Sequence, residues 1–212
     1  MPRAAQLLTI ASSTGGPVAL STLFEALPAP LAVPVLVTQH MPPNFTRLLA
    51  ARIAASTGHA CAEAVDGETP RPGRVYVAPG DYHLLVERRG AGTRLRLTQD
   101  PPVQHCRPAA DPMFASAAAA YGPGVLAVVL TGMGHDGRDG ADAIVRHGGR
   151  VLAQDEATSV VWGMPGAVAQ AGLADAVWPI PQIATHVAAC CGAAGMSARD
   201  RPRLPATAET VP

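Results

Sequence analysis

Three polar segments of the sequence contain side chains of the types that take part in nucleophilic catalysis. The segments are ASSTGG at residues 11–16, TQHMPP at 38–43 and TGMGHDG at 131–137. They supply Ser13 as a nucleophile, His40 as a general base that removes the serine proton, and Asp136 as a carboxylate that orients the histidine and stabilises its cation. The three residues together predict acyl transfer through a covalent intermediate, without a metal ion or an organic cofactor.

Each polar segment follows or closes a run of apolar residues that is typical of a buried strand. The runs are LLTIAS at 7–12, VPVLVTQ at 33–39 and VLAVVLT at 125–131. Strands that are apolar on both faces and alternate with helical patterns indicate a parallel sheet covered on both sides. We therefore expect a doubly wound α/β fold with a mainly parallel sheet. Ligands bind at the carboxyl ends of the strands in such sheets, so the three segments should converge there.

Taken one at a time, the three residues have simpler explanations. The STGG turn could bind a phosphate on its backbone N–H groups, although it has neither the spaced glycines of a dinucleotide site nor the lysine of a Walker motif. His40 alone is more often a structural histidine, and Asp136 alone could cap the following helix. Two neighbours compete for the same roles, Ser12 as the nucleophile and His135 as the base. The combination is more specific than any single residue.

The middle of the chain and its C-terminal end depart from the alternating pattern. Three closely spaced runs, RVYVAPG, YHLLVERRG and TRLRLTQ, predict a β-hairpin region at one edge of the sheet. Asp111 and Pro112 resemble the N-cap and the first residue of a helix. We expect one catalytic domain over residues 1–196 and a disordered tail over 197–212, which is rich in proline and charge.

The composition limits the classes of function. The 212 residues include 16 Lys and Arg and 16 Asp and Glu, and this zero net charge argues against a nucleic-acid binder. No apolar run is long enough to span a bilayer and none resembles a signal peptide, so we expect a cytoplasmic protein that is not inserted in a membrane. The four cysteines have neither metal-ligand nor disulfide spacing, and we interpret them as buried or idle thiols.

Five longer segments strengthen the prediction of acyl transfer because their order is that of one enzyme family. They are SSTGG at 12–16, TQHMPPNFTRLLAARI at 38–53, VYVAPGDYH at 75–83, LTGMGHDGRDGA at 130–141 and AQDEATSVVWGMPGAV at 153–168. From about Leu7 to about Ala189 the chain resembles the catalytic domain of the chemotaxis protein-glutamate methylesterases (CheB). The resemblance implies a doubly wound α/β domain, and it assigns the family's serine, histidine and aspartate to Ser13, His40 and Asp136.

The resemblance also implies a substrate, supporting residues and a mode of regulation. Family members hydrolyse glutamate methyl esters on chemoreceptors and release methanol, and some also deamidate receptor glutamines. Thr14 and Met133 would lie beside the active site and support the oxyanion. The chain departs from the family at Ala11-Ser12, where Gly-Ala is usual, and its first strand begins too near Met1 for the usual receiver domain. We therefore expect constitutive activity unless a receiver domain on a separate chain regulates it.

Three other functions are compatible with the sequence. A non-catalytic binding module could have kept this fold, but the complete set of Ser13, His40 and Asp136 argues against it. A nucleotide-binding protein could use the ASSTGG turn, but the Walker lysine is missing. An esterase with a substrate on another signalling protein is the third alternative, because the motifs specify the reaction more sharply than the receptor.

Overall fold

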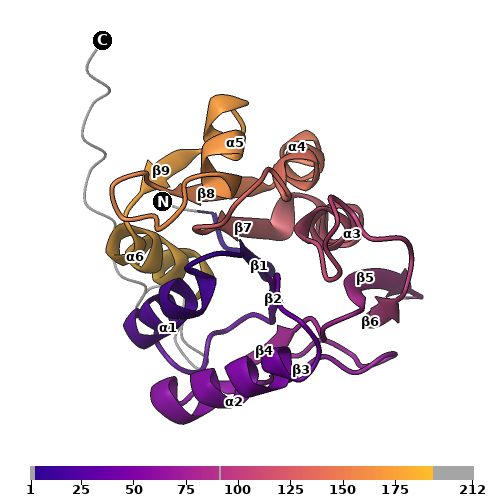
Figure 1. The fold of residues 1–212 in the computed structure, drawn as a ribbon. Helices are drawn as coiled ribbons and strands as arrows, with labels where there is room; N and C mark the ends of the chain where they lie inside the picture. The colour runs from indigo at the N-terminus through magenta and orange to yellow at the C-terminus, as the bar shows by residue number, and fades with distance from the viewer. Residues whose placement is uncertain (1–2, 91, 193–212) are drawn as a thin grey trace.

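A computed structural model describes residues 3–90 and 92–192. The fold is built on one parallel sheet of seven strands (Figure 1). Its spatial order is β3-β4-β2-β1-β7-β8-β9. The strands are β1 (Leu7–Ser12), β2 (Val35–Gln39), β3 (Ala60–Glu63), β4 (Arg74–Val77), β7 (Val125–Val129), β8 (Arg150–Gln154) and β9 (Ala176–Trp178). The first strand of the chain therefore lies in the middle, and the chain extends the sheet outwards from it in both directions.

Three helices pack against each face of this sheet. One face carries α1 (Gly16–Ala26), α2 (Phe45–Thr57) and α6 (Ile180–Cys191), and the other carries α3 (Ala110–Tyr121), α4 (Arg138–Arg146) and α5 (Met164–Gln170). A short 3₁₀ turn, η1 (Gly122–Gly124), leads from α3 into β7. The predicted doubly wound α/β class is confirmed, and the helices separate into two layers on either side of the strands in Figure 1.

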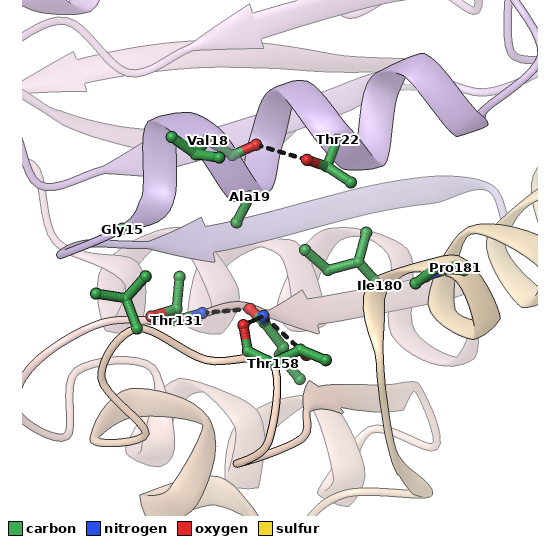
Figure 2. A pocket seen from close by; sticks show the side chains of 10 residues that line it. Gly15, Val18, Ala19, Thr22, Thr131, Thr158, Ile180 and Pro181 are labelled. Carbon is green, nitrogen blue, oxygen red and sulfur yellow. Dashed lines mark hydrogen bonds between the residues drawn. The ribbon is translucent and has the colours of Figure 1, made fainter.

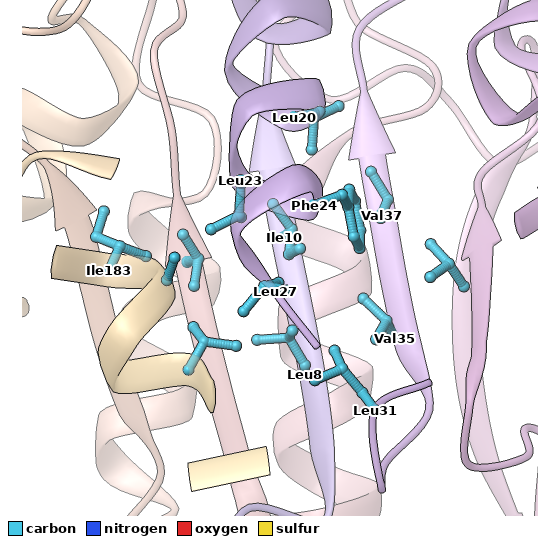
Figure 3. Packing of buried hydrophobic residues seen from close by; sticks show 14 of the residues in the cluster. Leu8, Ile10, Leu20, Leu23, Phe24, Leu27, Leu31, Val35, Val37 and Ile183 are labelled. Atoms are coloured by element: carbon cyan, nitrogen blue, oxygen red, sulfur yellow. The ribbon is translucent and has the colours of Figure 1, made fainter. Parts of the chain in front are cut away.

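The core explains why the strands are apolar on both faces. Leu8 and Ile10 of β1 point towards Leu23 and Phe24 of α1, as Figure 3 shows, and all four side chains are fully buried. Leu7 belongs to the cluster on the opposite face of the sheet. Burial of a leucine-sized side chain stabilises a fold by about 1.5–3 kcal/mol, so both helical layers hold the central strand firmly.

The middle of the chain differs from the expected hairpins at the sheet edge. Arg74–Val77 forms β4, which lies inside the main sheet between β3 and β2 and runs parallel to both. Its Val75, Tyr76 and Val77 are buried, and a strand that is apolar on both faces is stable only inside a covered sheet. The predicted hairpin exists as a separate antiparallel pair, β5 (His83–Arg89) and β6 (Gly92–Thr98), and β5 packs against α3.

Three further expectations concern the C-terminal tail, the end of the catalytic domain and membrane insertion. The predicted tail at 197–212 lies outside the described residues, as does the end of the predicted domain. Within residues 3–90 and 92–192, no helix is long and apolar enough to cross a bilayer.

Candidate active site

The three polar segments meet at the carboxyl edge of the sheet, because β2 and β7 are the two neighbours of β1. Ser12 pairs with Gln39 in the sheet register, and the next residues continue the ladder. The His40 N–H donates to the Ser12 carbonyl at 3.1 Å, and the Ser13 N–H donates to the Thr131 carbonyl at 3.0 Å. The predicted convergence is confirmed, and Ser13 stands between the other two segments.

The two neighbouring serines have different environments. Ser12 is the last residue of β1, is fully buried, and donates its hydroxyl proton to Gln39 Oε1 at 2.7 Å. Ser13 is the first residue beyond the strand and is partly exposed. Gln39 also donates from Nε2 to the Ser13 carbonyl at 2.9 Å, so this buried amide holds both serines in place. Of the two hydroxyls, only that of Ser13 is open to a substrate.

Glycines give the turn after Ser13 its shape. Gly15 has a φ of +80°, a left-handed conformation that L side chains rarely adopt. Gly16 begins α1 so close to Gln39 that an added Cβ would lie 2.0 Å from Gln39 Oε1. Thr14 is exposed on this turn, and its carbonyl accepts a hydrogen bond from Thr131 Oγ1 at 3.0 Å. The Ser13 turn, residues 13–15, is thereby fastened to both neighbouring strand ends.

His40 and Asp136 form a short side-chain contact at the centre of the site. The His40 Nε2 lies 2.6 Å from Asp136 Oδ2, and the two side chains are only 11% and 2% exposed. A carboxylate at this distance places the ring proton on Nε2 and leaves Nδ1 with a lone pair. The imidazole therefore turns its accepting nitrogen away from Asp136. In the part of the chain that the structure describes, the Ser13 hydroxyl makes no hydrogen bond to His40.

The Asp136 carboxylate is held by the start of α3 as well as by His40. The backbone N–H of Ala110 donates to Oδ2 at 2.6 Å, and that of Asp111 donates to Oδ1 at 3.0 Å. Burial alone would raise the pKa of Asp136, but the hydrogen bonds from His40 and the two amides outweigh it and lower the pKa. Asp136 is therefore a stable anion that can balance a cationic imidazole.

One sequence prediction about this region is wrong. Asp111 was expected to be the N-cap of the helix that follows it, but α3 already begins at Ala110 and its N-cap residue is Ala109. The carboxylate that accepts the first amides of α3 comes from Asp136, which lies 25 residues further along the chain. A carboxylate from another loop replaces a local cap, because both satisfy the unpaired amides of a helix N-terminus.

Cys106 is a residue of the site that the sequence analysis missed. Its Sγ lies 3.5 Å from His40 Nδ1, so this thiol is not idle in the sense we expected. Burial, together with the negative charge of Asp136, raises the pKa of Cys106. The group is therefore a neutral thiol at neutral pH, a weak hydrogen-bond partner of the histidine and a poor nucleophile.

The remaining candidates lie on the surface. His135 is exposed, whereas its neighbour Asp136 is buried. Met133 is 72% exposed on the β7–α4 loop, residues 130–137. Within residues 3–90 and 92–192, the backbone N–H groups of Thr14 and Met133 find no acceptor, so both are available to a ligand oxygen. Over the same residues, no cluster of three His, Cys, Asp or Glu could hold a metal ion.

A pocket of about 290 Å³ adjoins the site between α1 and the start of α6 (Figure 2). It touches the Ser13 turn through Gly15 and the β7–α4 loop through Thr131. Its other lining residues are Val18, Ala19, Thr22, Gln154, Thr158, Val160, Ile180 and Pro181. Gln154 accepts the Thr131 N–H at 2.8 Å, so a second buried amide at a strand end supports the loop beside Ser13.

Comparison with known proteins agrees with this arrangement. The family model described as CheB methylesterase matches residues 8–187. A relative from Nocardioides sp. (strain ATCC BAA-499 / JS614) is named protein-glutamate methylesterase/protein-glutamine glutaminase. It is 59% identical over 182 residues, which are 86% of this chain and 50% of the relative. One from Paramagnetospirillum magneticum with the same name, numbered 1, is 54% identical over 88% of this chain and 49% of its own length.

A solved structure supports the same relationship. The crystal structure of the Thermotoga maritima CheB methylesterase catalytic domain has a TM-score of 0.83 and 41% sequence identity to this chain. The match covers 85% of this chain and 96% of that domain. The chain thus spans about half the length of the curated relatives above, and nearly the whole of the catalytic domain. The chain belongs to the CheB methylesterase family.

Proposed function

We propose that this chain is a serine esterase that hydrolyses glutamate methyl esters on chemoreceptor-type proteins, with Ser13, His40 and Asp136 as its catalytic residues. The observation that carries the proposal is the fixed orientation of His40. Asp136 holds its Nε2 at 2.6 Å, on the strand end next to the accessible Ser13 hydroxyl. A histidine held in this way acts as a base through its other nitrogen.

Acylation uses the lone pair on His40 Nδ1. This nitrogen takes the Ser13 proton as Oγ attacks the ester carbonyl, and Asp136 stabilises the resulting imidazolium. The tetrahedral intermediate then collapses, the bond to the methoxy oxygen breaks, and His40 returns the proton so that methanol leaves. Hydrogen bonds of this kind are often long in unliganded enzymes and shorten when the substrate binds, which fits the separate Ser13 and His40 side chains.

Deacylation repeats the same steps with water as the nucleophile, and it regenerates Ser13 and leaves a glutamate. In both steps the oxyanion needs hydrogen-bond donors that are already in place. The unpaired N–H groups of Thr14 and Met133 are suitable, since one follows Ser13 directly and the other lies on the loop that binds Ser13 through Thr131. Deamidation of a glutamine follows the same path, with ammonia in place of methanol.

The surface around the site suits a protein substrate. Large apolar side chains are exposed on the elements that begin or end at this edge of the sheet. They are Val18 on α1, Phe45 and Leu48 on α2, Met133 on the β7–α4 loop and Val160 before α5. Exposed apolar groups of this size favour contact with another protein over contact with a small ester. The regulating receiver domain on a separate chain and the cytoplasmic location stay predictions from the sequence.

The proposal is tested by methanol release from methylated chemoreceptors in membranes of the same cell. Purified chain should release methanol, and Ser13→Ala should not, although its circular dichroism and melting temperature match those of the unaltered chain. Release at the same rate by Ser13→Ala would assign the reaction to another group. Absence of release by the folded chain from any methylated receptor of that cell would leave the binding module as the better explanation.

A further inference from the structure

Two carboxylates, those of Asp111 and Asp136, form reciprocal hydrogen bonds at the starts of α3 and α4. Asp136 precedes α4, yet it accepts the amides of Ala110 and Asp111 in α3. Asp111 lies in α3, yet its Oδ1 accepts the N–H of Gly137 at 2.9 Å and that of Gly140 at 2.7 Å at the start of α4. The Asp136 carboxylate thus binds the partially positive N-terminus of α3, and the Asp111 carboxylate binds that of α4.

We propose that Asp111 is a positioning residue of the active site, which holds Asp136 in the geometry that orients His40. The inference rests on the proposed esterase function and adds to it a residue that touches neither the substrate nor the reacting atoms. Its backbone N–H binds Oδ1 of Asp136, while its side chain fixes Gly137, the residue that follows Asp136. Asp111 therefore restrains Asp136 from two directions.

Close helix packing makes this restraint rigid. A Cβ added at Gly140 would lie 2.6 Å from Phe114 Cβ and 2.9 Å from the Asp111 carbonyl, so α4 and α3 leave no space between them. Gly137 has a φ of +93°, which allows the chain to turn from Asp136 into α4 within one residue. A small shift of Asp111 would therefore move Asp136, and His40 would move with it.

The charge of Asp111 matters as well as its position. Burial, with the negative charges of Asp136 and Asp139, raises its pKa to about 6, although the hydrogen bond from Gly140 lowers it. Below that pH a proton lies on Asp111 and its hydroxyl is a donor towards Asp136. Above it, a second negative charge stands beside the Asp136–His40 pair.

The other charged and titratable groups near Asp111 have partners of their own or are exposed. The buried His83 accepts the Ala109 N–H on Nδ1 at 3.2 Å. Asp139 binds Arg138, Asp142 binds Arg146, and Arg107 binds Asp81 across the preceding loop. His135 and His105 are exposed, and α3 carries no charged side chain apart from Asp111. Gln104, a neutral donor, approaches Asp111 Oδ2 at 3.4 Å. Asp136 is thus the group whose charge Asp111 most directly affects.

Two substitutions separate the geometric role from the charge. The substitution Asp111→Asn keeps an oxygen that can accept the Gly137 and Gly140 amides, and its neutral side chain mimics the protonated acid. Ala in Asp111→Ala removes the acceptor and leaves both amides unpaired. Asp139→Asn is the matched control, because it removes a carboxylate from the first turn of α4, the helix whose amides Asp111 accepts, at a side chain that is 68% exposed.

The experiment measures kcat and KM from pH 5 to 9 for the full chain and the three variants. We expect Asp111→Ala to lower kcat on the order of 10-fold to 100-fold with KM within about twofold, since a small misplacement of a catalytic group costs this much. Asp111→Asn should restore kcat to within about threefold. It should also shift the acid limb of the kcat/KM profile down by about half a pH unit, because a negative charge near the imidazolium is lost. Asp139→Asn should change neither quantity.

The inference is overturned if Asp111→Ala keeps its kcat, or if Asp111→Asn leaves the acid limb where it was. If Asp111→Ala does not fold, the acid limb of Asp111→Asn decides alone. The His40 ring signal in nuclear magnetic resonance provides a readout without turnover. At a fixed pH this signal should move in Asp111→Ala and stay unchanged in Asp139→Asn even if the chain released no methanol, so failure of the proposed function and failure of this inference are distinguishable.

Discussion

The Ser13 turn and the Asp136 loop reach the same edge of the sheet, but different forces hold them. Backbone hydrogen bonds to neighbouring strands, one buried amide and closely packed glycines fix the Ser13 turn. The buried Asp136 carboxylate and the half-buried Asp111 carboxylate, which accept amides from the starts of two helices, fix the Asp136 end of the β7–α4 loop. The first region is held by shape and backbone pairing, and the second by charge and helix N-termini.

Because different forces hold them, the two halves of the site should respond to different perturbations. Backbone ladders and steric contacts carry no titratable group, so the position of Ser13 should tolerate a change of pH and fail when volume is added. Charge–helix contacts depend on ionisation, so the position of Asp136 should tolerate small changes of volume and fail when charge is altered. Single substitutions can disturb the Ser13 turn or the Asp136 carboxylate separately.

Asp136→Asn should have the largest effect. The amide nitrogen that replaces one oxygen faces a donor in either orientation. At the Oδ2 position it meets His40 Nε2–H and the Ala110 N–H, and at the Oδ1 position it meets the Asp111 N–H. The imidazole then loses its fixed tautomer, and kcat should fall about 10⁴-fold, as when the carboxylate of a serine triad becomes an amide. Steady-state rates at pH 7 to 8 measure the loss, with circular dichroism as the control for folding. A loss of less than tenfold would contradict the role of Asp136.

Gly132→Ala should break the Ser13 half by volume alone. The added methyl would lie 2.9 Å from Ser13 Cβ and 2.4 Å from Met164 Sδ, so the Ser13 turn must move. A displacement of about 1 Å lowers kcat on the order of 100-fold, and here the factor should be the same at every pH. Gly92→Ala is the control, because an added Cβ there meets no atom within 4 Å. A loss that varies strongly with pH would mean that the Ser13 turn is also held by charge.

Ser12→Ala should affect stability more than turnover. The substitution leaves Gln39 Oε1 without its donor inside the sheet, and a buried unsatisfied group costs about 1–3 kcal/mol. Urea unfolding measures the free energy of unfolding, and the methanol assay measures kcat, which should stay within about threefold. Unchanged stability with a large loss of kcat would reverse the assignments of Ser12 and Ser13.

Asp111→Asn should give the smallest effect, a change in the pH dependence of stability. Burial raises the pKa of Asp111 from 3.8 to about 6, so the folded state favours the protonated acid. The stability contributed by this group is fully present below pH 3.8 and is lost as the pH rises through 6. Asn removes that loss, so the melting temperature of Asp111→Asn relative to the unaltered chain should be higher at pH 8 than at pH 4, by about 5 °C. An equal difference at both pH values would contradict the raised pKa.

Most of the fold and the three main candidate residues could be predicted because their signals are local. An apolar run followed by a short polar segment marks both a strand and the edge where it ends, and the parallel sheet brings those ends together. This reasoning located Ser13, His40 and Asp136 at one edge.

The residues that the sequence analysis missed act across long separations in the chain. The hydrogen bonds between Asp111 and Asp136 join residues 25 positions apart, and the contact of Cys106 with His40 joins residues 66 positions apart. A local rule for helix caps assigned Asp111 to its own helix, because sequence alone does not show which N-terminus a carboxylate reaches. A local signal existed for Gln39 alone. Thr38 and Gln39 are polar residues at the end of a strand that is otherwise apolar, and such residues indicate buried hydrogen bonds.

The position of a covalent adduct identifies the nucleophile directly. A fluorophosphonate probe phosphonylates an activated serine, and mass spectrometry of the peptide that contains residues 12 and 13 shows which hydroxyl carries the group. Our account predicts an adduct on Ser13 in the unaltered chain and in Ser12→Ala, and none in Ser13→Ala. An adduct on Ser12, or continued labelling of Ser13→Ala, would contradict the assignment of the nucleophile and with it the mechanism.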